Sequence, residues 1–303
     1  MTASGGGSSI YDLGYRGYEG PRLGRWAAVA ALLTHSVRTA YGLGRSARSK
    51  VMPVAIVLMA LLPSLVMLGL FAVAAQAGPA SEAFERILPI RYSTLYPFTA
   101  PLIFLFSASQ APELFGRDQR AGVLPLYFSR ATSRLDYAGA RTLGLLASLL
   151  VLVLAPQLLL LVGRVMVAAD PVAGLGKELP EVPAMLAVAV FMVAVVGTVS
   201  AATAALTPRR AYATVAIIGI LLIPSIVAAQ FVELETGLLG QAAVLLSPAV
   251  VIEGVNAFLF GVSPDNETLV MAGLPDWSYA LAAGAWIAGS LLVLARRYQR
   301  IEA

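Results

Sequence analysis

Long apolar runs separated by short polar segments make up most of this chain of 303 residues. The hydrocarbon core of a bilayer is about 30 Å thick, so a helix needs roughly 20 apolar residues to cross it. The sequence predicts six membrane spans, at residues 51–75, 92–109, 143–169, 183–206, 211–231 and 277–295. Prolines inside these runs are tolerated because neighbouring helices can satisfy the freed backbone groups. The predicted fold class is therefore an all-α, polytopic membrane protein.

The composition supports this assignment. Hydrophobic residues make up 58% of the chain, charged residues only 13%, and the mean hydropathy is +0.80. Soluble domains carry about 25% charged residues, so a soluble globular protein is excluded. Residues 51–303 are predicted to form one transmembrane domain.

The N-terminal part divides in two. Residues 1–21 are rich in Gly and Ser and are predicted to be a disordered or loop segment. Residues 22–50 are predicted to form an amphipathic helix lying in the membrane interface, with arginines between apolar positions spaced by three and four. The apolar face of that helix comprises Trp26, Val29, Leu33, Val37 and Tyr41. A secretory signal peptide is the alternative interpretation, but no A-x-A-like cleavage site follows closely.

The distribution of basic residues predicts the topology. With six spans and an inner N-terminus, the inner segments hold 17 of the 21 Lys and Arg residues and the outer segments hold four. Basic residues concentrate in the cytoplasmic loops of membrane proteins. Both termini are therefore expected to be cytoplasmic.

A seventh apolar run, residues 238–262, is interrupted by Ser247 and Pro248 and contains Glu253 and Asn256. If it spanned the membrane, the C-terminal arginines would move to the outer side and Glu253 would enter hydrocarbon, at a cost of roughly 3 kcal/mol. A re-entrant or surface-lying hairpin on the outer side avoids both problems. We therefore expect an outer hairpin before the last span.

The chain offers little material for catalysis or metal binding. It has no cysteine and one histidine, His35, so the usual zinc ligand sets and Ser/His or Cys/His pairs are not available. Residues 174–177, GLGK, are the nearest match to a phosphate-binding loop, but Pro171 replaces the first Gly and Glu178 the Ser or Thr that would hold magnesium. We expect no catalytic residues, no metal, no cofactor bound by this chain and no nucleic-acid partner. The chain is not predicted to be an enzyme.

Residues 112–141 form the longest polar interruption between spans. Pro112 suits a first helical position, Glu113 the first turn and Gly122 the position just past a helix end. Glu113 also precedes Arg117 by four residues, a spacing that stabilises a helix by ~0.3 kcal/mol. The sequence thus predicts a separate cytoplasmic helix of about ten residues, an estimate from these start and stop signals.

Apolar residues accompany these charges. Leu114 and Phe115 lie on the same predicted helix and could present an apolar plug to a partner, while residues 123–128 are expected to pack under the third span. A solvated loop that only enforces orientation is the alternative, but the TPRR turn at 207–210 shows that such a loop can be much shorter.

The order of these parts resembles the permease subunits of type 2 (ABC-2-like) ATP-binding-cassette exporters. Two sequence patterns carry the resemblance, E-x-x-G-R-[DE]-x-x-x-G and L-x-x-S-R-x-x-S-R-x-[DE]-Y. The matching residues are Glu113, Gly116, Arg117, Asp118 and Gly122, followed by Leu126, Ser129, Arg130, Ser133, Arg134, Asp136, Tyr137 and Arg141.

The resemblance implies a coupling helix that docks on a separate ATPase subunit. The ATPase contact that it implies consists of Glu113, Leu114, Phe115, Gly116, Arg117, Asp118, Arg120 and Gly122. It further implies two cytoplasmic ATPase subunits, which bind the ATP and Mg, and a second permease copy, either identical or a close paralogue. The expected location is a bacterial cell membrane, in contact with membrane lipid.

Two other functions compete with an ABC permease. An ATP-independent secondary transporter or channel is compatible with the Pro-containing spans, although ion-coupled transporters usually carry ionisable groups at mid-membrane and these span interiors have none. A membrane-embedded enzyme or scaffold would rely on the polar cluster of Glu253, Asn256, Asp265 and Glu267 in and after the outer hairpin.

Overall fold

Helices account for the regular structure of the described part of the chain, in which no strand occurs. The computed structural model describes residues 20, 23–76, 91–129, 132–168, 170–235 and 237–300. The long helices are α2 (Ala47–Gln76), α4 (Leu95–Arg120), α6 (Arg134–Val167), α8 (Val182–Leu206), α9 (Arg210–Glu233) and α13 (Asp276–Gln299). The shorter elements are α1 (Gly24–Ala40), η2 (Tyr92–Thr94), α5 (Leu124–Phe128), α7 (Pro171–Glu178), η3 (Leu179–Glu181), α10 (Leu238–Leu245), α11 (Pro248–Phe260) and α12 (Glu267–Ala272).

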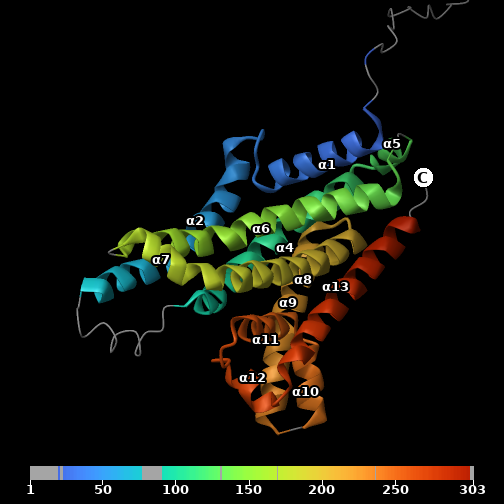
Figure 1. Cartoon of the computed structure of the whole chain (residues 1–303). Coiled ribbons are helices and arrows are strands. Elements are labelled where there is room, and N and C mark those ends of the chain that lie inside the picture. The colour runs from blue at the N-terminus through green and yellow to red at the C-terminus, as the bar shows by residue number, and fades with distance from the viewer. Residues whose placement is uncertain are drawn as a thin grey trace, which may run out of the picture.

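The helix α4 contacts α1, α2, α6, α8 and α9, while α13 packs against α6, α8 and α11. Figure 1 shows α4, α6 and α8 running side by side, with α5 near one end of this group and α7 at the other. The helices α10, α11 and α12 gather at one end of α9 and α13. The disordered segment predicted for 1–21 lies outside the described residues except for Gly20.

Membrane crossing is supported by length and composition. Among the described residues, α2, α6, the continuous stretch Pro171–Leu206, α9 and α13 are long and apolar enough to cross a membrane. The pair α10 and α11, bent by 88°, raises this number to six if the pair is one broken span. A multi-pass membrane protein is thus supported, while the exact number of spans stays a prediction.

The predicted second span, residues 92–109, corresponds to η2 and the first part of α4. The helix α4 is not among the helices that are both long and apolar enough to cross a membrane. The second half of α4 carries the polar residues that the sequence predicts to lie on a separate helix. Most of its first half is nevertheless buried, including Phe104 and Phe106. Protein rather than lipid therefore surrounds much of this helix.

The prediction that a separate helix begins at Pro112 is wrong, because α4 continues through Pro112 to Arg120. Proline has no N–H group, so it leaves the carbonyl of Ala108, four residues earlier, without its helical donor. The hydroxyl of Thr214 on α9 donates to that carbonyl oxygen at 3.0 Å. A neighbouring helix therefore replaces the missing hydrogen bond, and the chain does not need to break.

The end of α4 falls where the sequence places it. Gly122 has a positive φ of 64°, and Gly122 N donates to Gln119 O while Val123 N donates to Asp118 O, both at 3.2 Å. This is the Schellman pattern of a helix terminus, which favours glycine because a side chain is strained at positive φ.

The helix α6 begins nine residues before the predicted start of the third span. Ser133 is its N-cap: Asp136 N donates to Ser133 Oγ at 3.1 Å, and Ser133 N donates to Asp136 Oδ2 at 2.9 Å. This capping box satisfies two backbone donors and fixes the start of the helix. The S-R-x-D part of the recognised pattern thus has a local structural role.

The segment predicted as one interfacial helix over 22–50 is divided between α1 and the first turn of α2. Its predicted apolar face is split as well: Trp26 is exposed, whereas Val29 and Tyr41 pack against the core and Tyr41 Oη donates to Ser148 O at 2.7 Å. Contact with the membrane interface stays a prediction for the exposed side of α1.

Close contact between α1 and α6 depends on Gly144. A Cβ atom at this position would lie 2.4 Å from Ser36 Cβ and 3.2 Å from Leu33 O. We predict that Gly144→Ala lowers the free energy of unfolding by about 1 to 3 kcal/mol through overpacking. Gly139→Ala on the same helix, where a Cβ meets nothing within 4 Å, should raise it by about 0.5 to 1 kcal/mol. Thermal unfolding in detergent micelles measures both, and equal effects of the two substitutions would contradict this packing.

Candidate functional site

A polar network surrounds the C-terminal end of α4. At its centre, the carboxylate of Asp118 forms an ion pair with the guanidinium of Arg141 on α6. The Arg141 side chain is only 3% exposed and that of Asp118 only 14%. Tyr137 Oη donates to Asp118 Oδ2 at 2.7 Å, and Arg141 Nη1 donates to Ser36 Oγ of α1 at 3.3 Å. A buried charge needs such partners because it has lost its hydration.

Glu113 extends the network to two other helices. Its carboxylate lies 2.7 Å from Arg210 Nη1 at the start of α9 and 3.8 Å from Arg45 Nη1 in the turn between α1 and α2. The ion pair that the sequence predicts within the helix, with Arg117, is not formed. Glu113 therefore connects helices instead of stabilising its own.

The turn between α8 and α9 docks on the same end of α4. Arg120 Nη1 donates to Pro208 O at 2.8 Å, and Gln119 Nε2 donates to Ala205 O at 3.2 Å. A Cβ atom on Gly116 would lie 3.3 Å from Pro208 O. Absence of a side chain at Gly116 thus permits the close approach of this turn.

The last turn of α13 completes the network. The rings of Tyr298 and Tyr137 lie 5.6 Å apart at 46°, and both residues are fully buried. Arg134 Nη1 donates to Gln299 O at 3.0 Å, which joins the start of α6 to the end of α13. Tyr298 was missed by the sequence analysis, since an aromatic residue in a basic terminal segment carries no specific signal.

The residues assigned to an ATPase contact fall into two groups. Leu114 and Phe115 are buried, so they cannot serve as an exposed apolar plug in this conformation. Arg117, Arg120 and Gly122 are exposed. Together with Pro125 and Leu126 of α5, they form a surface that we call the α4–α5 tip, whose members are Arg117, Arg120, Gly122, Pro125 and Leu126.

His35 lies close to this network without forming a ligand set. Its Nε2 atom is 3.4 Å from Thr39 Oγ1. Burial lowers the pKa of His35, and repulsion by Arg141 lowers it further. Among the described residues, no group of three or more His, Cys, Asp or Glu side chains could hold a metal ion.

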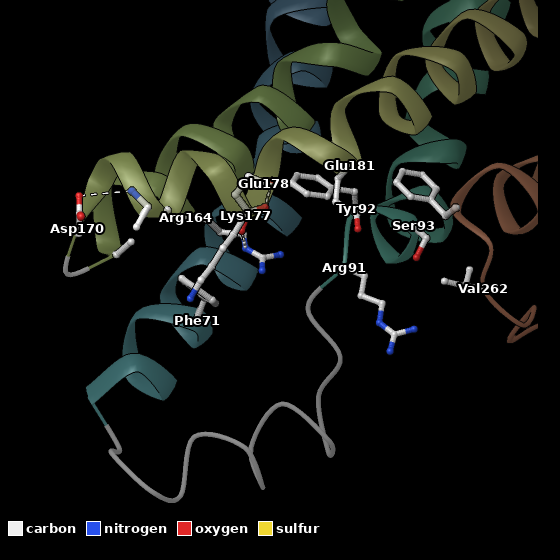
Figure 2. Close-up of a pocket in the computed structure, with 14 residues that line it drawn as sticks. Phe71, Arg91, Tyr92, Ser93, Arg164, Asp170, Lys177, Glu178, Glu181 and Val262 are labelled. Carbon is white, nitrogen blue, oxygen red and sulfur yellow. Dashed lines mark hydrogen bonds and ion pairs between the residues drawn. The ribbon is translucent and has the colours of Figure 1, made fainter.

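A second polar cluster lies at the far end of α6 and lines a cavity of about 890 Å³. Arg164 Nε is 3.0 Å from Glu178 Oε1, and Tyr92 Oη donates to Glu178 Oε2 at 2.6 Å. The Arg164 guanidinium also lies 4.8 Å from the centre of the Phe71 ring. Figure 2 shows these side chains around the cavity, with Lys177 and Arg91 also facing it. The GLGK segment belongs to α7 and is helical, so it is not a phosphate-binding loop.

The residues of the predicted outer hairpin occupy three different settings. Pro248 is the first residue of α11, after the N-cap Ser247. Asn256 Nδ2 donates to Ser93 O at 3.0 Å, and Glu253 Oε2 accepts from Asn266 Nδ2 at 2.8 Å. Pro248 and Asn256 therefore shape and anchor α11, whereas Glu253 is held by one amide and faces a cavity.

No protein-family model matches this chain, and no curated protein sequence matches it. The resemblance to type 2 ABC permeases therefore rests on the residues and their arrangement alone.

We predict that Arg141→Met lowers the free energy of unfolding by about 3 to 5 kcal/mol, because Asp118 would remain buried without its counterion. The double substitution Asp118→Leu with Arg141→Met should lower the free energy of unfolding by less than Arg141→Met alone does, since it removes both charges. Arg25→Met is the matched control, because Arg25 pairs with Asp136 at 2.6 Å but is 57% exposed. The decrease in the free energy of unfolding caused by Arg25→Met should therefore be much smaller. Unfolding in detergent micelles is the measurement, and equal losses for Arg141→Met and Arg25→Met would refute the central role of this pair.

Proposed function

We propose that this chain is the permease subunit of a type 2 ABC exporter and forms the translocation pathway. ATP hydrolysis takes place on two separate cytoplasmic ATPase subunits, which bind the ATP and Mg. A second copy of the permease, or a close paralogue, completes the assembly in a bacterial cell membrane. Both termini are cytoplasmic in this proposal.

The network around the end of α4 is the observation that carries the proposal. Asp118 connects α4 to α6, and Glu113 connects it to α9 and to the turn before α2. Arg120 adds the turn between α8 and α9. A force applied to the exposed residues of this end would therefore reach most of the long helices at once, as coupling between a motor subunit and a permease requires.

The α4–α5 tip is the proposed docking surface for the ATPase. Arg117 is exposed in the last turn of α4 and no described residue forms an ion pair with it. Leu126 is exposed on α5, which follows α4 closely in the chain. Exposed basic and apolar side chains on the same end of a molecule suit recognition by a partner, where the apolar group is buried and the charge selects orientation. The partly buried Asp118 and Glu113 hold this surface in place instead of contacting the partner.

We expect the double variant Arg117→Glu with Leu126→Asp to dissociate the ATPase while leaving the permease folded. The experiment co-expresses the full chain with any P-loop ATPase that a neighbouring reading frame encodes and measures the ratio of the two proteins after purification. A loss of at least ~1.4 kcal/mol of binding free energy would lower the affinity about tenfold.

Lys177→Glu is the matched control, because Lys177 is exposed at the opposite end of the molecule. It should leave the ratio of the two proteins unchanged. A tip variant that retains full ATPase binding, or the absence of any neighbouring ATPase that binds the chain, would overturn the proposal.

Glu253 supports a second candidate, an ATP-independent secondary transporter. It is a partly buried carboxylate that faces a largely apolar cavity, as proton-coupled carriers require. Vesicles containing the purified chain and a trapped pH-sensitive dye would then show proton flux without ATPase, which Glu253→Gln would abolish. Absence of flux above that of protein-free vesicles would exclude this candidate.

A further inference from the structure

A cavity of about 900 Å³ lies between α2, the start of α4, α11 and the segment 262–265. Its long wall is apolar. The side chains that form this wall include Met59, Leu62, Val66 and Leu70 of α2 and Phe98 and Leu102 of α4. Several of them, including Leu62, Val66 and Phe98, are largely exposed, so the cavity is open along one side to whatever surrounds α2.

One end of the cavity is polar and acidic. Glu253 and Asp265 both line it, and among the described residues no Lys, Arg or His does so. The Glu253 carboxylate accepts one hydrogen bond from Asn266 and forms no ion pair with a described residue. Asp265 is exposed, and no ion pair is formed with it in the described part of the chain. The polar end therefore carries two carboxylates that have no counterion among the residues that the structure describes.

The polar end lies toward the C-terminal end of α2. Ser93 lines this cavity and also the polar cavity that contains Phe71, the residue after Leu70. Asn256, one turn after Glu253, donates to Ser93 O at 3.0 Å. The polarity of the cavity therefore changes along α2, from apolar near Met59 to polar beside Leu70.

The dimensions fit one leaflet of a bilayer. Met59 and Leu70 are eleven residues apart on α2, which corresponds to about 16 Å along the helix axis. The hydrocarbon core is about 30 Å thick, so one leaflet contributes roughly half of that. Since α2 is long and apolar enough to cross the membrane, an apolar wall of this length can accommodate a hydrocarbon chain of about the depth of one leaflet.

We propose that this cavity binds a lipid-like amphiphile with an ammonium head group. A hydrocarbon chain lies against the apolar wall of α2 and α4, and the ammonium group pairs with Glu253 and Asp265. An anionic head group is disfavoured because both carboxylates would repel it. This inference goes beyond the permease proposal, since binding requires neither an ATPase nor transport.

The test uses the full chain purified in detergent and an acyl-labelled phosphatidylethanolamine as the fluorescent probe. Two unlabelled lipids compete with this probe for binding: phosphatidylethanolamine and its N-acetyl derivative. The derivative keeps the acyl chains but loses the ammonium charge. A hydrogen-bonded ion pair supports roughly tenfold or greater preference for the amine. Equal competition by the two lipids would overturn the proposal.

Two variants locate the head group. Glu253→Gln should abolish the preference for the amine, whereas Glu233→Gln, an exposed carboxylate on α9 outside the cavity, should retain it. Free phosphoethanolamine at the same concentration as the lipid should not displace the probe. Displacement by this soluble head group, or a preference that survives Glu253→Gln, would show that the amphiphile does not bind as proposed.

Two further variants locate the hydrocarbon chain of the bound lipid. Val66→Trp partly fills the cavity and should weaken binding of both lipids. Leu65→Trp, an adjacent exposed position that does not line the cavity, should have no effect. Identical binding by the two variants, with unchanged elution in size-exclusion chromatography, would refute the assigned site.

Discussion

The buried ion pair between Asp118 and Arg141 is the interaction on which the arrangement at one end of the molecule depends. Each charge would be costly to bury alone, so the presence of one requires the other within contact distance. Tyr137 donates a further hydrogen bond to Asp118, which joins the start of α6 to α4, and Arg141 donates one to Ser36, which joins α6 to α1. The position of α4 relative to its neighbours is thus fixed by charge pairing as well as by apolar packing.

This constraint explains why α4 is both the most polar of the long helices and largely buried. Its first half is covered by neighbouring helices, and its second half exchanges hydrogen bonds and ion pairs with α6, α9 and the turn before it. Helices such as α2 and α9 are instead largely exposed along their apolar surfaces, which suits contact with lipid. A rigid polar end and a lipid-facing periphery are compatible with a subunit that receives force at one end and contacts lipid along its sides.

The two ends of the molecule differ in their chemistry. The end with the α4–α5 tip has exposed Arg117 and Leu126, whereas the other end has the acidic cleft with Glu253 and the Arg164–Glu178 cluster. Carboxylates at one end of an apolar cavity suit an ammonium-bearing amphiphile. If the chain is a permease, this cavity lies at the end opposite the proposed motor.

Local chemistry in the sequence determined the helical class, the apolar runs long enough to cross a membrane, the helix end at Gly122 and the polar character of residues 112–141. Those features depend on residues close together in the chain. Only the tertiary structure decided that α4 continues through Pro112, because the compensating donor, Thr214, is about a hundred residues away. For the same reason the sequence could not show that Glu113 pairs with Arg210, that Leu114 and Phe115 are buried, or that the Tyr298 ring packs against Tyr137. Each of these depends on contacts between distant segments, which helical spacing does not encode.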